Sequence, residues 1–147
     1  MKRGPVMVAA AAFAVVASAC RGGHEDQVSR APARTVNIDM KDIAFQPTTF
    51  TAQRGERVRF VFHNRGQLPH DAFIGDAQAQ AEHEREMRQG DDDGHGMHEG
   101  GDGKGITVEP GKTGHLTYTF DRTGTIEIGC HQPGHYAAGM KMAVTVA

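Results

Sequence analysis

The sequence predicts an all-β sandwich of short strands, interrupted by one helical insertion. Several segments alternate apolar and polar residues with a period of two, which is typical of half-buried strands. Turns that contain glycine or proline separate these segments, as in small β-sandwiches. The chain has 147 residues, of which 38% are hydrophobic, and this is enough for one small domain but not for two.

The N-terminus has the features of a secretory signal peptide. Lys2 and Arg3 precede an apolar run over residues 5–16, which is too short and too rich in alanine for a permanent membrane helix. Small residues then lead to Cys20. We therefore expect residues 1–19 to be a signal peptide of the lipoprotein type, with Cys20 lipidated and residues 20–34 acting as a flexible tether. An ordinary signal peptide cut near Ala19 is the alternative.

Charge and cysteine content limit the classes of function that the protein can have. Without Lys2 and Arg3 the chain has 14 basic and 18 acidic residues, a net charge of −4, and it has no run of lysine or arginine. This argues against nucleic-acid binding. If Cys20 carries a lipid, Cys130 is the one thiol left in an oxidising compartment, which favours a thiol that is buried or bound to a metal.

The alternating segments, taken in order, predict where the key side chains point. We expect strands within residues 35–40, 57–63, 72–74, 106–108, 115–120, 125–130 and 140–146. Ile126, Ile128 and Cys130 share one parity, so a strand that buries the isoleucines also directs the thiol inward. Met140 shares its parity with the apolar residues of the last strand, and His70 shares its parity with Ala72 and Ile74, so both can face the same interior.

A cysteine, a histidine and a methionine lie at regular spacing near the C-terminus. Cys130, His135 and Met140 form a Cys-x4-His-x4-Met pattern. A copper centre that cycles between Cu(I) and Cu(II) uses a thiolate, two imidazoles and a weak axial thioether. One more histidine is therefore required, and His70, at the end of a loop, is the candidate. A core histidine with satisfied hydrogen bonds is the competing interpretation of His70 alone.

Residues 76–104 break the strand pattern. They contain nine acidic and three basic residues, a net charge of −6. Residues 76–87 predict a short, exposed helix capped by Asp76, followed by a disordered run of aspartate and glycine, and we expect this insertion to contribute nothing to the core. Its histidines and methionines are either incidental or an accessory copper site. They are His83, Met87, His95, Met97 and His98.

The stretch from Cys130 to Met140, with Pro133-Gly134-His135 and Gly139 inside it, resembles the copper loop of the cupredoxins (plastocyanin- and azurin-like blue copper proteins). Among these the chain is most similar to bacterial periplasmic cupredoxins with a His/Met-rich insertion, some of which are associated with copper tolerance. The resemblance implies a Greek-key β-sandwich over residues 35–147, with copper at one end. It also implies Cys130, His70 and His135 as equatorial ligands and Met140 as the axial ligand.

Two functions follow from this resemblance. The first is one-electron transfer through a type 1 copper site, with a redox partner protein. The second is copper tolerance or copper handling in the cell envelope, in which the insertion binds additional Cu(I). We expect a monomer. We also expect no enzymatic activity, because no catalytic triad or carboxylate pair stands out. A binuclear copper electron-transfer centre would need two loop cysteines, and the loop contains only Cys130. We expect the periplasm as its location, with membrane contact only through a lipid anchor.

Overall fold

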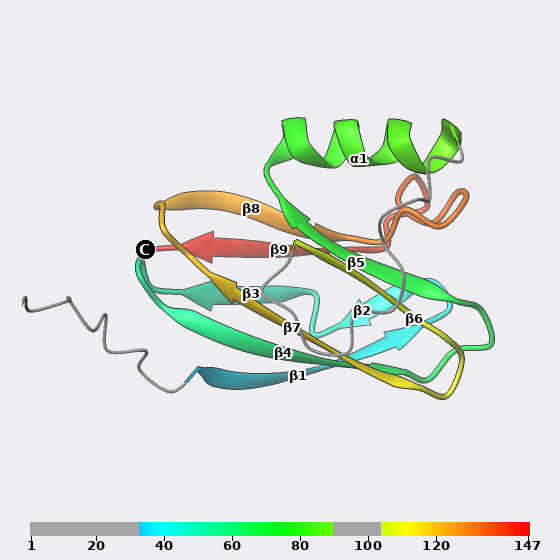
Figure 1. The fold of residues 1–147 in the computed structure, drawn as a ribbon, viewed down its shortest axis with the longest axis horizontal. Coiled ribbons are helices and arrows are strands. Elements are labelled where there is room, and N and C mark those ends of the chain that lie inside the picture. The colour runs from blue at the N-terminus through cyan, green and yellow to red at the C-terminus, as the bar shows by residue number, and fades with distance from the viewer. Residues whose placement is uncertain (1–32, 90–103) are drawn as a thin grey trace, which may run out of the picture.

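The computed structural model describes residues 33–89 and 104–147, which fold into two packed β-sheets and one helix (Figure 1). The four-stranded sheet contains, in spatial order, β2 (Ala44–Gln46), β1 (Arg34–Lys41), β4 (Arg57–Asn64) and β7 (Thr113–Thr119). The five-stranded sheet contains β3 (Thr49–Ala52), β9 (Lys141–Val146), β8 (Gly124–Gly129), β5 (His70–Gly75) and β6 (Gly105–Val108).

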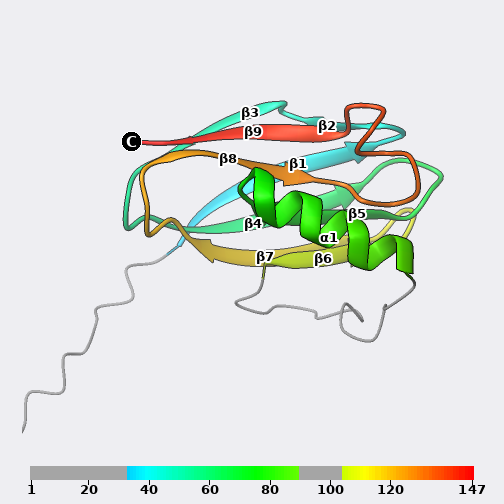
Figure 2. The same ribbon diagram turned by 90° about the horizontal axis from the view of Figure 1, so that it is seen from above.

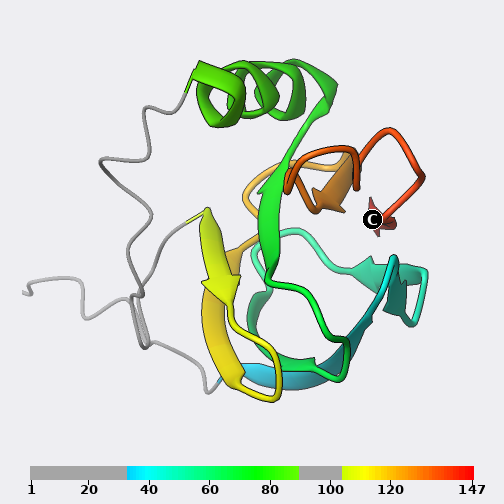
Figure 3. The same cartoon turned by 90° about the vertical axis from the view of Figure 1, so that its right-hand side faces the viewer.

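The chain passes repeatedly from one sheet to the other, as the two perpendicular views show (Figures 2 and 3). The β1–β4 and β3–β9 pairs are parallel, and the other paired strands are antiparallel. The expected Greek-key sandwich with one helical insertion is confirmed.

Apolar side chains from the inner faces of both sheets fill the space between them. Alternate residues of β9, beginning with Met142 and Val144, are fully buried, as a period of two requires. Aromatic rings of β3, of β4 and of the residue that follows β7 meet there, with Phe60 5.5 Å from Phe50 and 6.3 Å from Phe120 between ring centroids. These edge-to-face contacts add to the stabilisation that comes from burial.

The helix α1 (Ala77–Gln89) follows β5 directly and packs on β5 and β8, outside the five-stranded sheet (Figures 1 and 3). Asp76 caps it as expected, because its Oδ1 accepts the N–H of Ala79 at 2.9 Å. The expectation that this helix is exposed is wrong on one side, since Gln80 and His83 are buried against the sheet. As expected, the helix adds no residue to the hydrophobic core. Within the described ranges, no helix is long and apolar enough to span a membrane.

Candidate metal centre

Three strand ends meet at one end of the sandwich and bring the predicted ligands together. Strand β5 begins at His70, β8 ends one residue before Cys130, and β9 begins one residue after Met140. Because β8 pairs antiparallel with both β5 and β9, these positions lie at the same end of the sheet. The loop that joins β8 to β9 is the orange-red segment at the right of Figure 1.

The side chains of this cluster face one another inside the protein. The Sγ atom of Cys130 lies 3.8 Å from Nδ1 of His70 and 3.4 Å from Nδ1 of His135. These three potential ligand atoms lie within 4.8 Å of one another. Met140 is fully buried beside them. A thiol, two imidazoles and a thioether form a donor set that suits copper and fits the chemistry of a type 1 site.

Backbone hydrogen bonds fix the β8–β9 loop and tie the candidate ligands to one another. The N–H of Met140 donates to the carbonyl of His135 at 3.0 Å, and the N–H of Cys130 donates to the carbonyl of Met140 at 3.1 Å. Gly134 and Gly139 have φ angles of 83° and 95°, a region that favours glycine. The loop can therefore turn twice and still return Met140 to the site.

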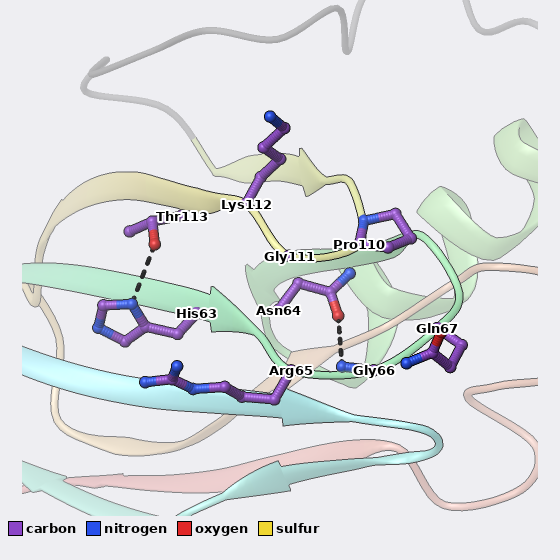
Figure 4. Close-up of a pocket in the computed structure, with 9 residues that line it drawn as sticks. All are labelled: His63, Asn64, Arg65, Gly66, Gln67, Pro110, Gly111, Lys112 and Thr113. Atoms are coloured by element: carbon purple, nitrogen blue, oxygen red, sulfur yellow. Dashed lines mark hydrogen bonds between the residues drawn. The ribbon is translucent and has the colours of Figure 1, made fainter.

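A second loop, between β4 and β5, delivers His70, and Asn64 holds it in place. The Asn64 amide nitrogen donates to the carbonyls of Leu68 and Val108 at 2.8 Å, and its Oδ1 accepts the N–H of Gly66 at 2.9 Å (Figure 4).

The loop between β4 and β5 also lines a surface pocket together with the turn between β6 and β7 (Figure 4). His63, in the same pocket, is hydrogen-bonded to Thr113 at 3.0 Å and is separate from the cysteine cluster.

The two nitrogens of the His70 ring have different neighbours. Nδ1 faces the sulfur of Cys130, whereas Nε2 lies 2.8 Å from Oδ1 of Asp42, in the turn between β1 and β2. The Gln67 amide, together with the His70 ring, holds the pKa of Asp42 below its ordinary value. His70 is fully buried, whereas His135 is 7% exposed and is the nearer of the two to solvent.

Burial shapes the protonation of the cluster. Burial, and then the nearby Asp71 carboxylate, raise the pKa of the Cys130 thiol. Burial also lowers the pKa of His135, and the neighbouring His70 adds to this effect. The neutral imidazole is the form that binds a metal, so His135 is kept in its ligand form, while the thiol must lose its proton when a metal binds.

Asp71, the residue after His70, fixes the start of the β8–β9 loop. Its Oδ1 accepts the N–H groups of His131 at 2.7 Å and of Gln132 at 3.1 Å. Burial alone would raise the pKa of Asp71, but its contacts with His83, Cys130 and His131 outweigh this and lower the pKa. The buried carboxylate of Asp71, which follows His70, is thus hydrogen-bonded to the backbone of His131, which follows Cys130.

Helix α1 holds the ring of His131, directly after Cys130. Nε2 of His131 lies 2.6 Å from Oε1 of Gln80, and Nδ1 lies 2.5 Å from Oε2 of Glu84. The ring also stacks on Tyr136 at 4.5 Å between centroids and meets the ring of His83 edge-on at 5.0 Å. Helix α1 therefore supports the loop between β8 and β9.

The four predicted copper ligands lie together in the structure. Of the residues predicted for a possible accessory copper site, the structure describes His83 and Met87, which both lie on α1. His83 is buried, and its ring stacks on Phe73 at 4.1 Å. Met87 lies one turn further along α1 and is half-buried. Cys20, His95, Met97 and His98 lie outside the described residues, as does the predicted signal peptide. Among the described residues, His70, Cys130 and His135 are the one group of three or more His, Cys, Asp or Glu side chains close enough to hold a metal.

Sequence reasoning missed the residues that surround the ligands. Asp42, Gln80 and Glu84 lie 28, 51 and 47 positions from the histidines that they contact. No local pattern marks them. Only Asp71 and His131 carried a signal, because each directly follows a candidate ligand.

Comparisons with known proteins agree with this geometry. The family model for copper-binding proteins of the plastocyanin/azurin family matches residues 32–147. A copper-resistant cuproprotein (CopI) of Pseudomonas aeruginosa is 33% identical over 165 aligned positions, which cover 96% of this chain and 91% of that protein. The protein of the same name from Rubrivivax gelatinosus is 37% identical over 114 positions, which cover 77% of this chain and 66% of that protein.

Solved structures show the same fold. Auracyanin B superposes with a TM-score of 0.64 at 25% identity, covering 80% of this chain and 91% of its own. The reduced auracyanin of Roseiflexus castenholzii has a TM-score of 0.63 at 24% identity, covering 80% of this chain and 99% of its own. The copper loop, the sandwich and the matched family model lead to one conclusion: the chain belongs to the plastocyanin/azurin family of copper-binding proteins.

Proposed function

We propose that this protein is a type 1 copper protein of the cell envelope that transfers single electrons through Cys130, His70, His135 and Met140. One observation carries the proposal: two imidazole Nδ1 atoms, at 3.8 Å and 3.4 Å, face the same buried thiol sulfur. A trigonal His2Cys set with a weak axial methionine is the arrangement of blue-copper electron-transfer sites.

The way the ligands are held supports electron transfer. Both loops are fixed by hydrogen bonds that involve no metal, including those from Met140 to His135 and from Cys130 to Met140. A site whose geometry is set by the protein changes little between Cu(I) and Cu(II), so little reorganisation opposes transfer. Because His135 is closer to solvent than His70, we propose that electrons pass to a partner protein at the His135 side.

The test is a copper titration of the purified chain, followed through repeated reduction and oxidation. We expect one tightly bound Cu(II) per chain with an intense thiolate-to-copper absorption band. The band should disappear on reduction and return on oxidation without loss of metal. The Cys130→Ala variant removes the thiolate and should lack the band. A blue band that persists in this variant, or copper that is released at each reduction, would contradict the proposal.

Copper tolerance is the second candidate. Curated relatives carry the name copper-resistant cuproprotein, and the part of the insertion that follows α1 in the sequence contains His95, Met97 and His98. We propose that these residues bind Cu(I) beyond the one type 1 copper. The test must keep α1, because Gln80 and Glu84 support the copper loop. A deletion of residues 91–103 is therefore suitable, and it should remove the additional copper but leave the blue band. A stoichiometry of one before and after deletion would refute this role.

We further propose a monomeric carrier in the periplasm, anchored to the membrane by a lipid on Cys20, rather than an enzyme. The apolar run over residues 5–16 and the small residues before Cys20 support this location. In cell fractionation, the full chain should sediment with membranes and the Cys20→Ala variant should be soluble. Identical fractionation of both would refute the lipid anchor.

A further inference from the structure

We propose that Asp42 is a positioning residue of the copper site, whose carboxylate fixes the His70 ring through its Nε2–H group and favours Cu(II) over Cu(I). This inference rests on the proposed type 1 site. It concerns a residue that lies far from the Cys-x4-His-x4-Met motif in sequence.

The geometry leaves each nitrogen of His70 with one role. Nδ1 faces the sulfur of Cys130 at 3.8 Å, so it is the nitrogen available to a metal. Nε2 must then carry the proton, and a buried N–H group needs an acceptor. The Oδ1 atom of Asp42, at 2.8 Å, is that acceptor. A carboxylate in this position fixes the tautomer and the orientation of the ring.

The carboxylate is itself held in place by the loop that delivers His70. The Gln67 N–H donates to Oδ2 of Asp42 at 2.7 Å, and the Leu68 N–H approaches Oδ1 at 3.4 Å. At Gly66 an added Cβ would lie 2.0 Å from Oδ1 and 2.7 Å from Cγ of Asp42. A glycine at position 66 is thus what lets the carboxylate lie against the loop.

The charge of this group has a predictable effect on copper. A negative charge next to a ligand stabilises Cu(II) more than Cu(I), because the oxidised ion carries the larger positive charge. The Asp42 side chain is 30% exposed, so solvent screens part of the effect. Loss of such an outer partner typically costs about 10–100-fold in metal affinity. Removing the charge should therefore weaken Cu(II) binding, affect Cu(I) less, and raise the reduction potential.

The experiment compares Asp42→Asn with the matched control Asp39→Asn in the full chain. Asp39 lies three residues earlier, on β1, and its Oδ1 contacts Arg65 Nε at 3.2 Å. Both variants remove one negative charge, but only Asp42→Asn removes the carboxylate charge that lies next to His70. We expect at least a tenfold larger loss of affinity for Cu(II) than for Cu(I) in Asp42→Asn, equivalent to a rise of about 59 mV in potential. Asp39→Asn should change both affinities less than twofold.

The Gly66→Ala variant and the tautomer of His70 test the same contact independently. Gly66→Ala displaces the carboxylate without removing its charge, so it should also weaken Cu(II) binding about tenfold, and it replaces Asp42→Asn if that variant does not fold. Nitrogen NMR of the metal-free protein should show the His70 proton on Nε2 in the wild type. It should show a mixture of His70 tautomers in Asp42→Asn and in Gly66→Ala.

The outcomes separate this inference from the proposed function. A blue wild-type protein in which the Asp42 and Asp39 variants behave alike would overturn the role of Asp42 alone. Unchanged copper affinities and an unchanged His70 tautomer in Gly66→Ala would do the same. A wild type without the thiolate-to-copper band would overturn the proposed function, and the role of Asp42 with it.

Discussion

Gln80 offers a strong test of the contact between the inserted helix and the copper loop. Its side chain is 1% exposed, and its Oε1 lies 2.6 Å from Nε2 of His131. Its amide nitrogen donates to the carbonyls of Glu127 at 2.9 Å and Phe73 at 3.1 Å. Replacement by alanine would leave these buried groups without this partner.

The expected loss can be worked out from these three hydrogen bonds. Each contributes about 0.5–1.5 kcal/mol, and a buried group left without a partner costs about 1–3 kcal/mol. We therefore expect Gln80→Ala to lower the free energy of unfolding by roughly 2–4 kcal/mol. Helix propensity acts in the opposite direction, because alanine is the better helix former.

Urea unfolding of the metal-free protein measures this loss, and Gln78→Ala is the matched control. Gln78 lies in the same helix but is exposed, so its replacement should change stability by no more than about 0.5 kcal/mol. The copper-loaded Gln80→Ala protein should also release copper faster, because His131 adjoins Cys130. If the two variants have equal stabilities, the helix does not support the loop and the reasoning is refuted.

Two further predictions concern the side chains around the copper loop. The Tyr136 hydroxyl donates to Glu127 at 2.5 Å, and burial together with this carboxylate raises its pKa from 10.0 to about 12. The unfolded chain ionises first as pH rises, so this contribution to stability is complete below pH 10 and is lost between pH 10 and about 12. The free energy of unfolding, measured with urea, should fall less between pH 9 and pH 11.5 in Tyr136→Phe than in the wild type. An equal fall in both proteins would contradict the assignment. His83→Asn should lower stability by about 1–2 kcal/mol, because the ring stacks on Phe73, while additional bound copper is retained. Loss of copper equivalents on metal analysis would instead make His83 a ligand.

The sequence was sufficient to predict those features that depend on local periodicity. The shared parity of Ile126, Ile128 and Cys130 correctly predicts an inward thiol, and the parity of His70 with Ala72 correctly predicts an inward imidazole. These predictions succeed because alternate side chains of a strand face the same side, whatever the strand order.

The surroundings of the site could not be predicted in this way. Helix α1 is mostly polar, so its periodicity gives no sign of a buried face. Gln80 is nevertheless buried, with its amide hydrogen-bonded to His131 and to the carbonyl of Glu127. His83 is buried with its ring stacked on Phe73. Asp42 contacts His70 only because the β1–β2 turn and the β4–β5 loop meet at one end of the sandwich. Polar contacts between distant segments leave no pattern in a single sequence.

The copper-loaded crystal structure, with copper located by its anomalous scattering, tests the central claim most directly. We predict one copper ion bonded to Sγ of Cys130 and to Nδ1 of both His70 and His135, with the Met140 sulfur as a longer axial ligand. The Nε2 atom of His70 should still contact Asp42. Copper bound elsewhere, with the Cys130 sulfur unligated, would contradict the account.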